Sequence, residues 1–308
     1  MGTLRLARPR RLRRGDRVRL VAPAGPFAPR ALQEGQRVLE GLGLVPVVSR
    51  AEFARDGFLA GSDRSRAQRL TAALEEAGTR AVWCIRGGYG TARLLPLLRL
   101  PRLRRQPKLL IGFSDVTALL LQLAGPEGFV TVHGPVVIQL PRLRRTDLRW
   151  IERLLFAPHA PEAVPLGRTR TLVAGRAEGR LVAGNLCTLA SLAGTRFAPD
   201  LRGAILCIED VNEEAYALDR LVCQVASAGM LRGVRGIVLG ELTRCTPTGS
   251  GPHSARRVVE RAVAALGLPA VSGAAFGHGT RHVALPLGVR ARLDASAGSL
   301  TLLEAAVA

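Results

Sequence analysis

A serine lies where an apolar run changes abruptly into a helix-like run, in the segment GFSD. Residues 109–113 (LLIGF) have the apolar character of a strand, and DVTALLLQL after them is typical of a helix. On such a turn the Ser114 hydroxyl projects from the carboxyl edge of a sheet, and the backbone N–H of Asp115 points into the same space. This pattern indicates a nucleophile beside an oxyanion donor. Because Val116 replaces the final glycine of G-x-S-x-G, an ordinary helix N-cap remains the alternative.

A nucleophilic serine needs a base, and the base needs a group that orients it. Of the five histidines, His278 follows a strand-like run and lies between two glycines in FGHGT, so little bulk blocks access to it. His159 and His253 lie in polar segments that we expect to be exposed. His133 and His282 lie at expected strand edges, where a structural hydrogen bond is the commoner role. His278 is the best candidate for the base.

Two acidic residues, Glu209 and Asp210, end the apolar strand-like run AILCI. A carboxylate at a buried strand end is unfavourable unless it accepts hydrogen bonds, which indicates a partner. Asp210 fits the N-cap of the helix that follows, with Glu213 as its capping-box partner. Glu209 is then free to orient His278. The alternative is a surface loop that carries unrelated acids.

A glycine-rich turn, RGGYG at residues 86–90, follows another strand-like run and opens a helix-like one. It matches the dinucleotide fingerprint G-x-G-x-x-G only loosely, because Arg93 replaces a glycine and no acidic residue follows at the required distance. We therefore predict that no nicotinamide or flavin binds here. The backbone amides of this turn would instead polarise a carbonyl oxygen. The absence of HExxH, CxxC and histidine clusters predicts that the protein uses no metal and no cofactor.

Alternating strand-like and helix-like segments position these residues in the first half of the chain. Repeated βα units predict a parallel sheet with helices on both faces, in which ligands bind beyond the carboxyl ends of the strands. The expected strands are 18–22, 44–48, 81–85, 109–113 and 130–132, and the expected helices are 30–41, 64–77, 91–100 and 115–123.

A second domain follows a Pro- and Arg-rich connection that holds one short helix. We expect an N-terminal α/β domain at residues 1–140, a linker at 141–165 and a C-terminal domain at 166–308. The expected strands of the second domain are 171–175, 181–184, 204–210, 236–242, 269–273, 282–294 and 299–304, and its helices are 185–192, 213–228 and 254–266.

The composition limits the classes of partner. The 308 residues carry a formal charge of +20, which is typical of a phosphate-binding surface. Lys108 is the sole lysine, so the arginine excess resembles a GC-rich coding bias, and aromatic residues make up only 4%. We expect no specific nucleic acid partner, although a non-catalytic polyanion-binding protein remains the alternative from another class.

The apolar runs and the cysteines bear on location. The longest apolar runs are too short to span a membrane, and the N-terminus lacks the apolar segment of a secretory signal. The five cysteines are scattered, and most lie in apolar runs, so we interpret them as buried thiols of a protein in the reducing cytoplasm.

Together these segments resemble the LD-carboxypeptidase family of serine peptidases, which includes the microcin C self-immunity peptidases. The resemblance runs in family order from about Gly15 to Leu302. Its pieces are GDRVRLVAPAGP, AVWCIRGGYGTARLLPLL, LIGFSDVTALLL, TVHGPV, GRLVAGNLCTLASLAGT, ILCIEDVNEEAYALDRLVCQ, GIVLGEL and VSGAAFGHGTRHVALPLG. One departure is AGNL at 183–186, where many relatives carry a second glycine.

The resemblance implies a catalytic triad of Ser114, Glu209 and His278, with an oxyanion hole made by the amides of Gly88 and Asp115. It implies a flavodoxin-like N-terminal domain, a smaller β-rich C-terminal domain and a homodimer. The implied reaction removes a terminal D-amino acid from an L-centre, as in conversion of a murein tetrapeptide to the tripeptide plus D-alanine. The rival within the family cleaves aminoacyl-nucleotide analogues, but the segment at 167–185 has no Trp or Tyr to stack a base.

Overall fold

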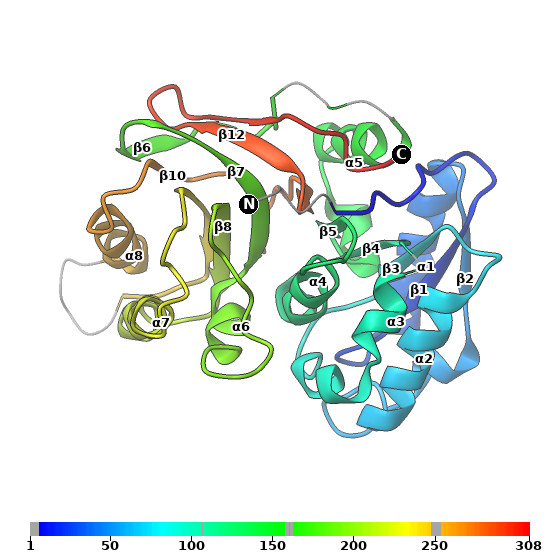
Figure 1. The fold of residues 1–308 in the computed structure, drawn as a ribbon. Helices are drawn as coiled ribbons and strands as arrows, with labels where there is room; N and C mark the ends of the chain where they lie inside the picture. Colours follow the sequence, from blue (N-terminus) through cyan, green and yellow to red (C-terminus); the bar gives the residue numbers. More distant parts are fainter. Residues whose placement is uncertain (1–5, 106, 158–159, 161–162, 248–253) are drawn as a thin grey trace.

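The structure is a computed structural model, and it describes residues 6–105, 107–157, 160, 163–247 and 254–308. Two β-sheets, each accompanied by helices, lie side by side (Figure 1). His159 and His253, which we expected to be exposed, fall outside the described residues. None of the described helices is long and apolar enough to cross a membrane.

The first sheet has six strands in the order β11-β5-β4-β3-β1-β2. Five of them are β1 (Arg17–Val21), β2 (Val45–Val48), β3 (Ala81–Cys84), β4 (Leu109–Gly112) and β5 (Thr131–His133). These five run parallel, in the flavodoxin-like order 2-1-3-4-5. The side chains of β3 and β4 are buried throughout, as expected for strands covered on both faces. The predicted α/β class is confirmed.

The helices of this half are α1 (Pro29–Gly41), α2 (Asp63–Glu75), α3 (Leu100–Arg104) and α4 (Thr117–Leu123). Ser62 caps α2 by accepting a hydrogen bond from the amide of Ser65. The single helix expected at 91–100 is wrong. The chain forms a 3-10 helix at Ala92–Leu97 and then α3, because Pro96 lacks the N–H that a continuous helix requires.

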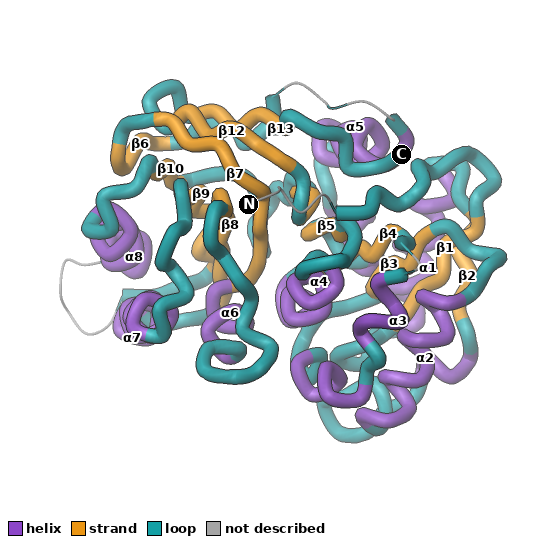
Figure 2. The backbone as a smooth tube through the Cα atoms, in the orientation of Figure 1, coloured by secondary structure: helices purple, strands orange, loops and turns teal. Residues whose placement is uncertain are grey.

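The second sheet has seven strands in the order β13-β12-β7-β8-β9-β10-β6. The strands β7 (Arg176–Asn185), β8 (Ala204–Val211), β9 (Gly236–Thr243) and β10 (Ala270–Ser272) are parallel. The strands β6 (Arg170–Val173), β12 (Arg290–Asp294) and β13 (Ser299–Leu302) are antiparallel to their neighbours. Helices α6 (Leu186–Ser191), α7 (Ala215–Ser227) and α8 (Ala255–Ala264) lie together along one side (Figure 2).

The two halves are joined by more than a linker. The expected strand at 282–294 is in fact two strands, because Gly288, with φ +94°, redirects the chain. Its first part, β11 (Leu285–Leu287), pairs antiparallel with β5 in the first sheet, whereas we expected it in the second domain. Helix α5 (Arg145–Phe156), from the expected linker, packs here, and the indole of Trp150 donates to the carbonyl of Ala284 at 2.7 Å.

The five cysteines are all free thiols, but they do not share one environment. Cys84 and Cys207 are buried in β3 and β8, as expected. The expectation is wrong for Cys187 and Cys223, which are exposed because they lie on the outward faces of α6 and α7. An apolar run therefore predicts a buried thiol in a central strand but not in an amphipathic helix.

Candidate active site

The structure brings Ser114, His278 and Glu209 together from three distant parts of the chain. The Ser114 hydroxyl oxygen lies 3.0 Å from Nε2 of His278, and Nδ1 of the same ring lies 2.7 Å from Oε2 of Glu209. The Glu209 side chain is fully buried, while that of His278 is 15% exposed. Both distances are within the range of a hydrogen bond, so a proton can pass between the hydroxyl and the imidazole.

Ser114 has an unusual backbone conformation. Its φ is +62°, in the left-handed region that residues other than glycine seldom adopt. The residue begins a short 3-10 helix, and the hydroxyl bonds the imidazole of His278 instead of capping a helix. The N-cap alternative is therefore wrong. Gly87 leaves room for this turn, because a Cβ at that position would lie 3.1 Å from Cβ of Ser114.

The side chain of Asp115 ties the glycine-rich turn to the turn that carries Ser114. Its carboxylate accepts hydrogen bonds from the amides of Gly90 at 3.2 Å and Thr91 at 2.9 Å, and the Thr91 hydroxyl donates to its carbonyl. Burial raises the pKa of Asp115, while the amide donors act against that rise. Within the described part of the chain, the Gly88 N–H takes part in no hydrogen bond. Gly88, with φ +116°, thus lies on a fixed turn with a free amide.

Glu209 and Asp210 differ in their partners. The carboxylate of Asp210 accepts hydrogen bonds from the Asn185 side chain at 3.0 Å and from the Cys187 amide at 2.8 Å, at the start of α6. The prediction that it caps the following helix with Glu213 is wrong, because β8 continues to Val211 and directs Asp210 toward the neighbouring strand. Burial raises the pKa of Asp210 to about 6. Glu209 contacts His278, as we expected.

A hydrogen bond between β7 and α4 links the two halves of the molecule close to Ser114 and Glu209. Asn185 ends β7 and is the register partner of Glu209 on β8. The backbone N–H of Asn185 donates to the hydroxyl of Thr117 at 3.0 Å, and Thr117 lies three residues after Ser114. The carboxyl ends of strands from both sheets therefore meet at the site, where ligands bind in α/β proteins.

The loop that carries His278 is held from both sides. Gly277 adopts φ +117°, and a Cβ there would lie 2.8 Å from Oε2 of Glu209. Beyond the histidine, Arg281 donates to Oδ1 of the fully buried Asp147 at 2.8 and 3.2 Å, and the His282 amide donates to its other oxygen at 3.3 Å. Asp147 belongs to α5, in the expected linker, and no local sequence pattern indicates this role.

His133 and His282 lie behind the site and have no ring-nitrogen hydrogen bond with the described residues. The structural hydrogen bond that we expected for them is absent there, because their rings pack against Phe113 at centroid distances of 5.7 and 4.4 Å. Burial lowers the pKa of His133 to about 4 and that of His282 well below its usual range. Both rings are therefore neutral near pH 7.

The described residues contain no group of three or more His, Cys, Asp or Glu side chains arranged to hold a metal ion. The arrangement can perform nucleophilic acyl transfer, because hydrogen bonds join a hydroxyl, an imidazole and a carboxylate beside the free backbone N–H of Gly88.

Comparison with known families supports the resemblance in both halves. Residues 18–134 match the model of the LD-carboxypeptidase N-terminal domain, and residues 178–293 match that of the C-terminal domain. A putative carboxypeptidase of Streptomyces coelicolor is 40% identical over 303 residues, which cover 96% of each chain. The murein tetrapeptide carboxypeptidase of Pseudomonas aeruginosa is 36% identical over 293 residues, covering 90% of this chain and 93% of that protein.

Solved structures give the same result. The muramoyltetrapeptide carboxypeptidase of Oxalobacter formigenes superposes with a TM-score of 0.82 at 28% identity, covering 93% of this chain and 97% of the other. The microcin C7 self immunity protein MccF has a TM-score of 0.85, but at 21% identity the likeness, over 98% and 99% of the two chains, shows a shared fold alone. The matches in sequence and structure show that the chain belongs to the LD-carboxypeptidase family.

Proposed function

We propose that this protein is a serine carboxypeptidase that hydrolyses the amide bond between an L-centre and a terminal D-amino acid. The observation that carries the proposal is the continuous Ser114–His278–Glu209 arrangement, with separations of 3.0 and 2.7 Å. The substrate we propose is a murein tetrapeptide, which yields the tripeptide and D-alanine. The names of the relatives from Pseudomonas aeruginosa and Oxalobacter formigenes support this substrate class.

In the proposed mechanism, His278 removes the hydroxyl proton as Ser114 attacks the carbonyl carbon next to the terminal D-residue. The amides of Gly88 and Asp115 stabilise the oxyanion of the tetrahedral intermediate. His278 then gives its proton to the leaving amine, and a water molecule activated by the same imidazole hydrolyses the acyl-enzyme. Glu209 keeps the ring in the tautomer with Nδ1–H, as the 2.7 Å contact allows.

The strain at Ser114 supports a catalytic role. A left-handed serine costs roughly 1–3 kcal/mol, and such a cost persists mainly where function depends on it. The surroundings hold the conformation, since Gly87 removes a side chain that would touch Ser114 and Asp115 fixes the adjacent turn. A helix cap would need no such arrangement.

A second candidate is cleavage of aminoacyl-nucleotide analogues, because MccF has been solved in complex with glutamyl sulfamoyl guanosine. The segment at 167–185 in this chain contains no Trp or Tyr that could stack on a nucleobase. We therefore favour the murein peptide.

The test is incubation of the full chain with a murein tetrapeptide, with D-alanine release as the readout. The expected result is stoichiometric release by the native chain and a loss of about 10⁴-fold or more in the Ser114→Ala variant, since triad members act as a unit. An aminoacyl sulfamoyl adenosine serves as the competing substrate. Hydrolysis of the nucleotide analogue alone would replace the substrate proposal, whereas full activity of the variant would refute the assignment of Ser114.

A further inference from the structure

A cleft of about 990 Å³ runs between the two sheets and is distinct from the Ser114 site. In the first half it is lined by α4 and the segment that precedes β5, and in the second half by β7 and the segments that precede β8 and β9. We call it the arginine cleft, defined by Arg104, Gln122, Val182, Arg202 and Arg235 among its lining residues. We propose that this cleft binds a small phosphorylated molecule that carries two or more negative charges and an apolar part.

The residues that line the arginine cleft have a net positive charge. Seven arginines line it against three acids, Glu178, Asp200 and Glu304, so the lining has a net charge of 7 − 3 = +4. The excess is concentrated in one concave surface, where low-dielectric walls strengthen the field on an entering anion. A cleft with this charge selects anions.

Three of the seven arginines form ion pairs with the three acids, whereas the other four have no carboxylate partner among the described residues: Arg104, Arg180, Arg196 and Arg235. Arg104 donates to the carbonyl of Gln122 at 2.7 and 3.2 Å, Arg235 donates to the carbonyl of Glu178 at 3.0 Å, and Arg180 donates to that of Asp200. A carbonyl orients a guanidinium but leaves its charge uncompensated. Burial lowers the pKa of both Arg104 and Arg180, which shows that these charges are partly desolvated. A bound anion would offset that cost, and phosphate oxygens match the planar guanidinium fork.

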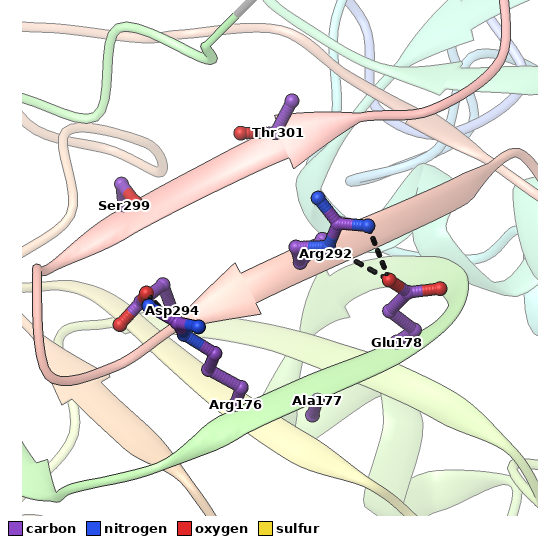
Figure 3. A pocket seen from close by; sticks show the side chains of 7 residues that line it. All are labelled: Arg176, Ala177, Glu178, Arg292, Asp294, Ser299 and Thr301. Atoms are coloured by element: carbon purple, nitrogen blue, oxygen red, sulfur yellow. Dashed lines mark hydrogen bonds and ion pairs between the residues drawn. The ribbon is translucent and has the colours of Figure 1, made fainter.

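A nearby groove of about 560 Å³ on β7, β12 and β13 shows the opposite arrangement (Figure 3). Its Arg292 pairs with Glu178 at 2.6 Å, and its Arg176 pairs with Asp294 at 2.7 Å. The charged residues of that groove compensate one another. The arginine cleft differs because four of its seven arginines form no ion pair, and this excess does not follow from the arginine-rich composition alone.

The floor of the arginine cleft is apolar and indicates what accompanies the phosphate. The apolar residues that solvent reaches there are Leu6, Pro126, Ala198 and Pro199, while Leu121, Val130, Val182 and Leu287 are buried beneath them. Bare inorganic anions would leave this surface in contact with water, whereas a nucleoside or acyl group would cover it. The chemistry that fits is a phosphorylated metabolite of nucleotide size.

The cleft lies far from Ser114. Gly203 and Arg235, which line it, precede β8 and β9, while Glu209 lies near the other end of β8. Six residues along a strand correspond to about 20 Å. A ligand here therefore occupies a second site and does not depend on the proposed peptidase reaction.

The test is isothermal titration of the full chain at fixed ionic strength with two probes, ATP and inorganic pyrophosphate. We expect saturable binding of one ATP per chain, with pyrophosphate at least threefold weaker because it lacks an apolar part. Arg104→Gln combined with Arg180→Gln should weaken ATP binding at least tenfold. The matched control combines Arg37→Gln and Arg257→Gln on exposed helical positions and should change binding less than twofold.

Equal weakening by both double variants would show non-specific attraction to a basic protein and would overturn the proposal, as would the absence of saturable ATP binding. If the Arg104/Arg180 variant does not fold, the exposed Arg235→Gln variant replaces it, with an expected loss of at least threefold. Ser114→Ala should bind ATP as the native chain does. Loss of ATP binding in Ser114→Ala would place the ligand in the peptidase site instead and contradict a second site.

Discussion

Replacement of Asp115 by asparagine tests whether this side chain positions the oxyanion turn. The carboxylate accepts hydrogen bonds from the amides of Gly90 and Thr91, one with each oxygen. An asparagine retains one acceptor but turns an NH₂ group toward the other amide, so one donor then faces another donor. The turn that carries Gly88 should move away from Ser114.

The structure sets the size of the effect. A buried hydrogen bond to a charged group contributes about 1.5–3 kcal/mol, so the free energy of unfolding should fall by roughly that amount. Removing one oxyanion donor typically lowers turnover by about 10²–10³. Because the turn keeps one of its two hydrogen bonds to this side chain and so moves only partly, we expect kcat to fall about 100-fold in Asp115→Asn, with KM changed less than threefold.

The assay is steady-state release of D-alanine, with unfolding by urea as the measure of stability. Glu260→Gln is the matched control, because Glu260 is also buried and accepts a hydrogen bond from Ser272 at 2.6 Å, but it lies on α8 and does not contact the site. The control should lose stability and keep kcat. If Asp115→Asn also keeps kcat within threefold while its stability falls, the positioning role is refuted.

Three further changes test other parts of the structure. Thr117→Val removes the 3.0 Å bond to the Asn185 amide between the sheets, and we expect kcat to fall about tenfold with a loss of roughly 1–2 kcal/mol in urea unfolding; unchanged kcat would separate this contact from the site. Lys108→Met leaves three acceptors without their donor, the nearest at 2.5 Å, and should lower the free energy of unfolding by about 2–4 kcal/mol; a loss under 0.5 kcal/mol would contradict that estimate. Folding lowers the pKa of His133 to about 4, so between about pH 6.5 and 4 the unfolded chain binds more protons than the folded chain. The free energy of unfolding should therefore fall by about 3 kcal/mol as the pH falls through this window. Asp210, with its pKa raised to about 6, acts with the opposite sign, so we compare native chain and His133→Phe at each pH, and parallel stability curves would refute the effect of His133.

Much of the site could be predicted because each of its three main residues has a local signature. Ser114 follows a strand and opens a helix, Glu209 ends an apolar run, and His278 lies between glycines. Such features depend on neighbours in the sequence, and parallel strands then bring their carboxyl ends to one edge. The family resemblance added the assignment of roles, and the roles themselves remain proposals.

The residues that the sequence did not reveal depend on contacts between distant segments. Asp147 lies in a stretch with the composition of a linker, yet it holds Arg281 next to the loop that carries His278. Asp210 has the spacing of a helix cap, but the length of β8 directs it to the start of α6. The strand β11 joins the other sheet because Gly288 turns the chain, and its pairing with β5 has no signature in the local pattern.

Several expectations remain predictions. The homodimer and the cytoplasmic location rest on the family resemblance and the cysteine pattern alone. The domain limits 1–140, 141–165 and 166–308 remain a proposal, which limited proteolysis of the native chain tests: the first cuts should fall within the linker. The mass of the native chain in solution, compared with the 32.8 kDa of one chain, tests the dimer.

The most direct test of the proposed mechanism is to map the adduct formed with a serine-directed fluorophosphonate. The account predicts a single modified peptide that contains Ser114, formed at least 100-fold more slowly in His278→Ala because the base that activates the hydroxyl is gone. A modified residue elsewhere in the chain, or equal labelling of the Ser114→Ala variant, would contradict it.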